Sequence, residues 1–262
     1  MNISVYIIAF NEAEKISDCI NSVLWADEII VADSHSTDDT TEIAEELGAT
    51  VVQIPFNGFG NLRNQAINHC NGDWIISLDC DERCTYEVRD EILSLVENAT
   101  FDIYRVPRKN FFMGKWIKHS GWYPNFRQPQ LFKKGKMSYT LDSVHEGFIN
   151  HSDKEIGVIK NFIWQFPFKN TEEVINKANR YSTLGIEKLQ KSGVTGGVLK
   201  AFFHGLWSFI KHYIFKLGFL DGGAGFVIAF GNFEGTFYRY IKLTEAESDW
   251  TVPKVKTITK DS

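Results

Sequence analysis

The stretch that decides the fold is WIISLDCDER, residues 74–83. The mostly apolar run Trp74–Leu78 is typical of a buried strand, and it leads directly into two carboxylates, Asp79 and Asp81. Side chains two residues apart in extended backbone point the same way, so both acids can share a face while Cys80 points elsewhere. Two like charges this close disfavour joint ionisation unless a cation neutralises them. Their oxygens suit Mg²⁺ or Mn²⁺, which would also bridge a diphosphate; the alternative is an exposed turn with two solvated acids.

Strands and helices alternate through the first hundred residues. Such alternation is typical of βαβ units, so we expect an α/β fold with a mostly parallel sheet flanked by helices. The expected strands are Ile3–Phe10, Glu28–Ala32, Thr50–Ile54 and Trp74–Leu78. The expected helices are Asn11–Leu24, Ser36–Leu47 and Asn61–His69, the first capped by Asn11 and the second by residues 36–38.

Polar side chains follow three of the expected strands. Asn11 comes after the first, Asp33 ends the second, and the acid pair ends the fourth. Ligands of parallel α/β sheets bind beyond the carboxyl ends of the strands, so these residues indicate one site on one rim. Asp33 could accept bonds from a base or ribose, and Arg63 could bind a phosphate bidentately. The alternatives are helix caps for Asn11, Glu12 and Asp33, and a surface ion pair for Arg63.

The composition excludes several classes of protein. The net charge of −5 over 262 residues gives no global attraction to nucleic acid, and 44% hydrophobic residues argue against disorder. Four cysteines without a CxxC pair indicate free thiols and no structural zinc. The N-terminus is apolar without a basic leader, which favours a first strand over a signal peptide. No apolar run approaches the ~20 residues that a membrane-spanning helix needs.

The pattern changes after about residue 100. Short strand-like pieces are expected at Phe101–Pro107, Gln130–Lys133 and Glu146–Ile149. Helices are expected at Glu172–Gln190, Val198–Lys216 and about Phe226–Leu243, followed by a polar tail at 251–262.

Seven stretches occur in a familiar order between residue 5 and about residue 243. They are VYIIAFNEAEKI, EIIVADSHSTDDT, FGNLRNQA, WIISLDCDER, GWYP, VHEGF and YIFKLGFLDGGAGF. Together they resemble the family 2 glycosyltransferases, which have the GT-A fold. Within that family they resemble the β-1,4-glucosyltransferase branch that adds glucose to the inner core of bacterial lipopolysaccharide. The combination of VHE with the late GFLDGGAGF is the most specific part of the resemblance.

The resemblance implies a metal-dependent inverting transfer of a hexose, expected to be glucose. The donor would be a UDP-sugar, the acceptor a lipid-linked saccharide, and the cofactor Mg²⁺ or Mn²⁺. The protein would be cytoplasmic and peripheral on the inner leaflet of the bacterial inner membrane. It implies a GT-A catalytic domain at 1–170, with a nucleotide-sugar half (1–100) and an acceptor half (101–170), then a helical region at 171–250.

The resemblance also implies roles for particular residues. The nucleotide-sugar residues would be Phe10, Asn11, Glu12, Asp33, Arg63, Asp79 and Cys80. The metal ligands would be Asp81, Asp79 and His145; Trp122 and Tyr123 would bind the acceptor. Inversion needs a base for the acceptor hydroxyl, and Glu146 is the first candidate, with Asp142 the second. One departure is Gln130, where the family pattern leads us to expect an arginine, which puts a phosphate contact there in doubt.

Two aromatic stretches of the second half leave alternatives open. KNFFMGKWIKHSGWYP, residues 109–124, combines stacking faces with cations and suits a phosphate-bearing sugar, or else covers the core. Residues 200–220 are apolar with Lys200, Lys211 and Lys216 spaced along them. Such a helix could lie on an anionic membrane, pack on the catalytic domain or form a dimer. The oligomeric state stays open.

Other functions remain in consideration. A phosphatase of the haloacid-dehalogenase type also places DxD after an apolar strand, but Arg83 stands where a threonine or valine normally follows, and the motif comes late. An NAD-dependent dehydrogenase needs a glycine-rich turn where FNEAE stands. A non-catalytic nucleotide-sugar-binding module would keep the rim without a base.

Overall fold

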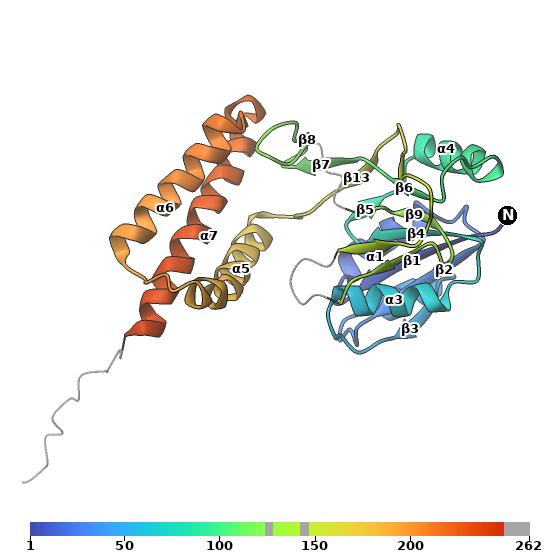
Figure 1. The fold of residues 1–262 in the computed structure, drawn as a ribbon, viewed down its shortest axis with the longest axis horizontal. Coiled ribbons are helices and arrows are strands. Elements are labelled where there is room, and N and C mark those ends of the chain that lie inside the picture. The colour runs from blue at the N-terminus through green and yellow to red at the C-terminus, as the bar shows by residue number, and fades with distance from the viewer. Residues whose placement is uncertain (124–127, 142–146, 249–262) are drawn as a thin grey trace, which may run out of the picture. The chain divides into compact units, whose positions relative to one another are not determined.

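The computed structural model describes residues 1–123, 128–141 and 147–248 (Figure 1). The chain forms two compact units. The first comprises Met1–Lys118 and Trp122–Pro167, and the second comprises His119–Gly121 and the chain from Phe168 onward. The polypeptide therefore passes between the units three times, because residues 119–121 belong to the second unit while their neighbours on both sides belong to the first.

A seven-stranded sheet forms the centre of the first unit. Its order is β12 (Gly157–Val158), β6 (Ile103–Arg105), β9 (Leu131–Lys133), β4 (Trp74–Asp79), β1 (Ile3–Ala9), β2 (Glu28–Asp33) and β3 (Thr50–Gln53). The four N-terminal strands run parallel, and β9 is antiparallel to β4 and β6. The predicted α/β class with a mostly parallel sheet is confirmed.

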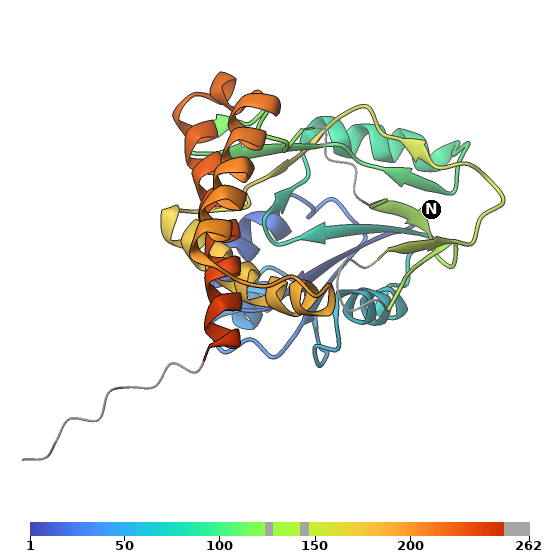
Figure 2. The same ribbon diagram turned by 60° about the vertical axis from the view of Figure 1, so that its left-hand side comes forward.

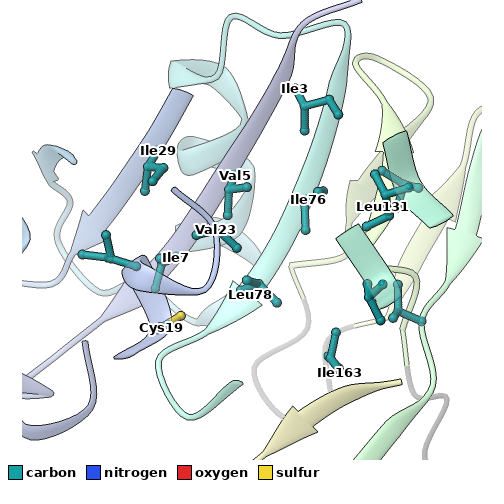
Figure 3. Close-up of a cluster of buried hydrophobic side chains, with 14 of the residues drawn as sticks. Ile3, Val5, Ile7, Cys19, Val23, Ile29, Ile76, Leu78, Leu131 and Ile163 are labelled. Atoms are coloured by element: carbon teal, nitrogen blue, oxygen red, sulfur yellow. The ribbon is translucent and has the colours of Figure 1, made fainter. Parts of the chain in front are cut away.

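Helices cover both faces of this sheet, which explains why its central strands are almost continuously apolar. Val5 and Ile7 of β1 face one core together with Cys19 of α1 (Ala13–Asn21) (Figure 3). Residues of α2 (Thr40–Glu46) and α4 (Tyr86–Glu97) belong to the same core. Tyr6, between them, faces a second core with residues of α3 (Phe59–His69). Alternate residues of one strand thus enter opposite cores.

Helix α4 was not among the elements expected from the sequence, although local signals for it are present. The Thr85 hydroxyl accepts a bond from the Val88 main-chain N–H at 3.3 Å, as an N-cap residue does. Val88, Ile92 and Val96 recur at a spacing of four residues and are buried. That spacing places them on one face of the helix, against the sheet.

Smaller elements complete the first unit. A second sheet has the order β5 (Glu82–Arg83), β13 (Ile163–Gln165), β7 (Arg108–Phe112) and β8 (Lys115–Trp116). A separate pair consists of β10 (Met137–Tyr139) and β11 (Phe148–Asn150). Since β5 begins three residues after β4 ends, the acid pair lies at the junction of the two larger sheets.

The second unit is helical, as expected. It contains α5 (Thr171–Lys191), α6 (Val198–Ile210), a π-helical turn Lys211–Phe215, a 3₁₀ turn Gly218–Asp221 and α7 (Gly223–Glu247). Helix α7 packs against both α5 and α6, and it lies beside α6 in both views (Figures 1 and 2). Within the described part of the chain, no helix combines the length and the apolar character needed to cross a membrane.

Asp102 gives the first unit a pH-dependent contribution to stability. Its carboxylate lies 2.9 Å from Lys133 Nζ and 3.3 Å from Lys154 Nζ, and it accepts a bond from Ser152 Oγ at 2.7 Å. The bond from Lys133, with those from Ser152 and Lys154, lowers the pKa of Asp102 from 3.8 to about 2. A lowered folded-state pKa stabilises the fold above the unfolded pKa, and this contribution is lost as the pH falls towards 2.

We therefore expect Asp102→Asn to lower the free energy of unfolding by about 1 kcal/mol at pH 7, an amount reduced because both lysines are partly exposed. The difference should shrink below pH 4. Urea unfolding at pH 7 and pH 3 measures it, with the exposed Asp153→Asn as the matched control. A pH-independent difference would contradict the assignment.

Candidate functional site at the carboxyl edge of the sheet

Strand register brings the predicted polar residues to the two sides of β1. Asp33, at the end of β2, pairs with Ala9, and Asp79, at the end of β4, pairs with Ile8. Asn11 follows two residues after β1 ends. The candidate rim is therefore built by three adjacent parallel strands, and Asp33 and Asp79 flank the central one.

Asn11 connects the loop after β1 to the loop after β2. Its backbone is left-handed, with φ of 54°, which asparagine tolerates better than most residues. Its side-chain oxygen accepts a bond from the Thr37 N–H at 2.8 Å, and its own N–H donates to Ser36 Oγ at 2.8 Å. Asn11 thus fixes the relative position of the two loops.

The helix cap expected at Asn11 is wrong, whereas Asp38, one of the residues expected to cap the second helix, accepts the N–H of Thr40, the first residue of α2, at 3.2 Å. Glu12 is the N-cap residue of α1 and Asp39 that of α2, and neither side chain makes a capping bond. The main-chain N–H of Glu12 instead donates to Thr40 Oγ1 at 2.8 Å, and that of Ala13 donates to Asp38 at 3.2 Å. The start of α1 is therefore capped by the side chains of Asp38 and Thr40, more than twenty residues away in sequence.

Asp33 is completely buried at the end of β2. One carboxylate oxygen accepts the Ser36 N–H at 2.8 Å, and the other accepts the Ser36 hydroxyl. These bonds hold the carboxylate in one orientation. Phe10, which follows β1, has an exposed ring.

Asp79 forms an ion pair with Arg63 of α3. Arg63 Nη2 lies 2.7 Å from Asp79 Oδ1, Nη1 donates to Ser77 Oγ at 2.9 Å, and the guanidinium lies over the Tyr139 ring. Burial by itself would lower the pKa of Arg63, but the pairing with Asp79 outweighs it and raises the pKa well above the usual value. A phosphate contact from Arg63 stays a prediction; the guanidinium orients Asp79.

Asp81 is held by the second sheet. Gln165 Nε2 of β13 lies 3.3 Å and 3.2 Å from its two carboxylate oxygens, and the Phe166 N–H donates to its main-chain oxygen at 2.8 Å. Between the acids, the buried Cys80 thiol donates to the Ile8 carbonyl at 3.2 Å, and burial raises its pKa. The Cys80 side chain therefore faces the core, which leaves only its main chain for a nucleotide.

A buried charged cluster lies next to the acid pair and was not foreseen from the sequence. Glu82 is fully buried and accepts bonds from the Asp79 N–H at 3.1 Å, from Gln130 Nε2 at 2.8 Å and from Arg108 Nε. Burial raises the pKa of Glu82 to about 7, against the lowering effect of Arg108. Gln130, where an arginine was expected, also donates to the Ser77 carbonyl, so its amide belongs to this cluster.

We expect Glu82→Ala to destabilise the protein by about 3–5 kcal/mol, because Arg108 would remain buried without its carboxylate. Chemical denaturation measures this loss. The double variant Glu82→Met, Arg108→Met should recover part of it, since no charge then stays buried alone. A single-variant loss below about 1 kcal/mol would show that the ion pair does not support the fold.

The residues present fit a divalent cation that arrives with its nucleotide. Asp79 and Asp81 offer hard oxygen ligands, whereas the described residues hold no group of three His, Cys, Asp or Glu that could enclose a metal. Mg²⁺ is typically held by one or two carboxylates together with substrate phosphates. The predicted third ligand, His145, and the predicted bases, Glu146 and Asp142, lie outside the described residues.

The predicted acceptor residues lie in a region of aromatic and cation–π contacts. The Trp122 carbonyl accepts a bond from Asn110 Nδ2 at 2.8 Å, and Tyr123 packs edge-on against Trp116. Lys109 Nζ and Lys118 Nζ lie 4.7 Å and 4.6 Å from the centre of the Trp116 ring. The aromatic and lysine side chains of this stretch therefore largely contact one another.

A mostly parallel sheet with acids at the carboxyl ends of β2 and β4 is typical of the GT-A fold. Residues 4–157 match the family model described as Glycosyl transferase family 2. The chain therefore belongs to glycosyltransferase family 2, and the predicted family and fold are both confirmed.

Three similar proteins illustrate the assignment. An uncharacterized glycosyltransferase of Rickettsia prowazekii (strain Madrid E) is 29% identical over 99% of this chain and 91% of its own. The lipopolysaccharide core biosynthesis glycosyltransferase LpsC of Rhizobium meliloti (strain 1021) is 28% identical over 87% of this chain and 89% of its own. The structure of S. aureus TarS 1-349 in complex with UDP-GlcNAc shares the fold, with a TM-score of 0.50, 14% identity, and coverage of 94% of this chain and 91% of that one.

Proposed function

We propose that this glycosyltransferase transfers a hexose, expected to be glucose, from a UDP-sugar to a lipid-linked saccharide of the lipopolysaccharide inner core, with inversion. The proposed UDP-sugar donor is supported by one observation: Asp33 and the acid pair lie on opposite sides of β1. The acceptor half is supported by the similarity to a lipopolysaccharide core glycosyltransferase.

The rim residues have separate tasks in this proposal. Asp33, oriented by Ser36, accepts bonds from the uracil or ribose. Asp79, oriented by Arg63, and Asp81, oriented by Gln165, would hold the divalent ion that accompanies the nucleotide. A divalent ion held there would supply positive charge to neutralise the departing UDP. Glu146 accepts the proton of the acceptor hydroxyl, which attacks the sugar from the face opposite UDP.

A donor screen tests the proposed reaction. The purified protein is incubated with a panel of nucleotide sugars and a core-oligosaccharide acceptor, with Mn²⁺ or with EDTA, and released nucleoside diphosphate is recorded. We expect UDP-glucose to give the largest release, and EDTA to abolish it. Release of inorganic phosphate would instead support the phosphatase, and UDP-sugar binding without turnover would support the non-catalytic module.

We further propose that α6 and the turns after it lie on an anionic membrane surface. Leu199, Phe203 and Trp207 recur every four residues on α6 and are 74%, 62% and 57% exposed. Helix α6 and the turns after it, residues 198–221, contain the lysines 200, 211 and 216 but a single acid, the buried Asp221. This positive, aromatic segment contrasts with the net charge of −5 of the whole chain and suits acidic lipid headgroups.

We expect Phe203→Glu to lower binding to phosphatidylglycerol vesicles at least tenfold, since burying one phenylalanine contributes about 1.5–3 kcal/mol. Vesicle flotation at low and high salt measures the loss. Tyr86→Glu, which changes an exposed ring of the first unit, is the matched control and should float like the wild type. Equal flotation of both variants would exclude α6 as the contact.

A further inference from the structure

Within the second unit, the two residues that precede one stretch of the family resemblance contact another such stretch. His119 and Ser120 directly precede GWYP, and Asp221 is the acid of the late stretch GFLDGGAGF. We propose that Asp221 is a positioning residue that fixes the acceptor-binding segment Trp122–Tyr123 through these two neighbours. The inference rests on the proposed function, because it assumes that this segment contacts the acceptor.

The Asp221 carboxylate makes three contacts with two consecutive residues. One oxygen accepts the His119 main-chain N–H at 3.1 Å and the Ser120 hydroxyl at 2.8 Å. The other lies 3.1 Å from Nδ1 of the His119 ring. The side chain of Asp221 is only 4% exposed, and Ser120 is completely buried. We call this arrangement of His119, Ser120 and Asp221 the clasp.

The backbone in the clasp needs such support. Ser120 and Gly121 are both left-handed, with φ of 59° and 82°. A serine in this region costs of order 1 kcal/mol or more and persists only where its surroundings hold it. The bonds from Asp221, together with the Ser120 N–H to Lys216 carbonyl bond at 2.9 Å, supply that constraint.

The glycines of the late stretch allow the clasp to close. A Cβ on Gly218 would lie 2.6 Å from the His212 carbonyl oxygen and 3.0 Å from Ser120 Oγ. A Cβ on Gly225 would lie 1.8 Å from the Gly218 carbonyl oxygen. Both approaches are too short for any side chain, so the glycines bring the turn that carries Asp221 close to Ser120.

The clasp is separated from the predicted acceptor residues by Gly121 alone. Beyond it, the Trp122 carbonyl is bonded to Asn110, so Trp122 is fixed on both sides in sequence. Asp221 lies about a hundred residues further along the chain and belongs to the second unit, whereas the donor-site residues described above belong to the first. Loss of the clasp is therefore expected to affect the acceptor and to spare the donor.

Kinetics with both substrates test this role. We expect Asp221→Ala to raise the acceptor KM at least about tenfold, since all three contacts of the carboxylate with His119 and Ser120 are lost. Calorimetry with UDP and Mn²⁺ should give wild-type affinity. Trypsin cleavage after Lys118 should also become faster. Asp221→Asn keeps one acceptor oxygen and should restore part of the acceptor affinity. Ser120→Ala, which removes a single bond, should raise the acceptor KM about threefold and decides the matter if Asp221→Ala does not fold.

A variant of the same unit separates positioning from general destabilisation. Asn170 caps α5 by accepting the Glu173 N–H at 3.0 Å, and its replacement by alanine costs about 1 kcal/mol without touching the clasp. Asn170→Ala should leave the acceptor KM unchanged. A wild-type acceptor KM in the Asp221 and Ser120 variants, or an equal rise in Asn170→Ala, would overturn the inference. Absence of transfer by the wild type would instead overturn the proposed function.

Discussion

Replacing Asp81 with asparagine is expected to lower the affinity for UDP in the presence of Mn²⁺ by at least about a hundredfold. Loss of a residue that merely orients a metal ligand typically costs 10–100-fold, so loss of a charged ligand should cost at least as much. The fold should survive, because the asparagine oxygen can still accept the bond from Gln165. Calorimetric titration with UDP, with and without Mn²⁺, measures the effect.

The comparison that decides the role of Asp81 is the dependence on metal. The wild type should bind UDP far more weakly without Mn²⁺, whereas the Asp81 variant should bind it weakly in both conditions. Asp90→Asn, which changes an exposed acid paired with Arg89, should behave like the wild type. Equal UDP affinity of the wild type with and without Mn²⁺ would remove the metal from the proposed reaction.

Glu146→Gln is expected to lower the transfer rate by about 10²–10⁴-fold while leaving UDP affinity unchanged, because glutamine cannot accept the acceptor proton. The measurement pairs UDP release in the presence of acceptor with calorimetric UDP binding. Asp142→Asn, made in parallel, distinguishes the two candidates, and the variant with the larger loss identifies the base. Unchanged turnover of the Glu146 variant would exclude Glu146 from that role.

Much of the sheet could be predicted because burial leaves a direct trace in the sequence. The apolar runs at Ile3–Ala9 and Trp74–Leu78 are strands covered on both faces, and their ends were found to within a residue. The strands β5 and β13 were not expected, since two or three residues are too few to show a period. Helix α4 was missed although its cap and its apolar spacing are both local.

The site was predictable where its residues follow strands directly. Asp33 and Asp79 lie at the rim because register alone brings them there. The contacts that fix Asp79 could not be predicted from the sequence. Glu82 accepts the Asp79 N–H and is itself bonded to Arg108 and Gln130, which are 26 and 48 residues away. A glutamate inside DCDER has the local pattern of a solvated acid, and only the second sheet makes it a buried one. The cap expected from Asn11 failed for the same reason, since Asp38 accepts the Ala13 N–H that such a cap would bind.

The triple passage of the chain between the two units has a consequence for protein engineering. The helical unit cannot simply be removed by truncation at Pro167, because residues 119–121 belong to it. Such a truncation would remove Asp221 and with it the bonds that support the left-handed backbone of Ser120. An exchange of acceptor specificity between relatives would have to transplant the segment around residues 109–124 together with the turn at 211–225. Recombination at a single crossover point between them would pair His119 and Ser120 of one protein with the Asp221 region of another.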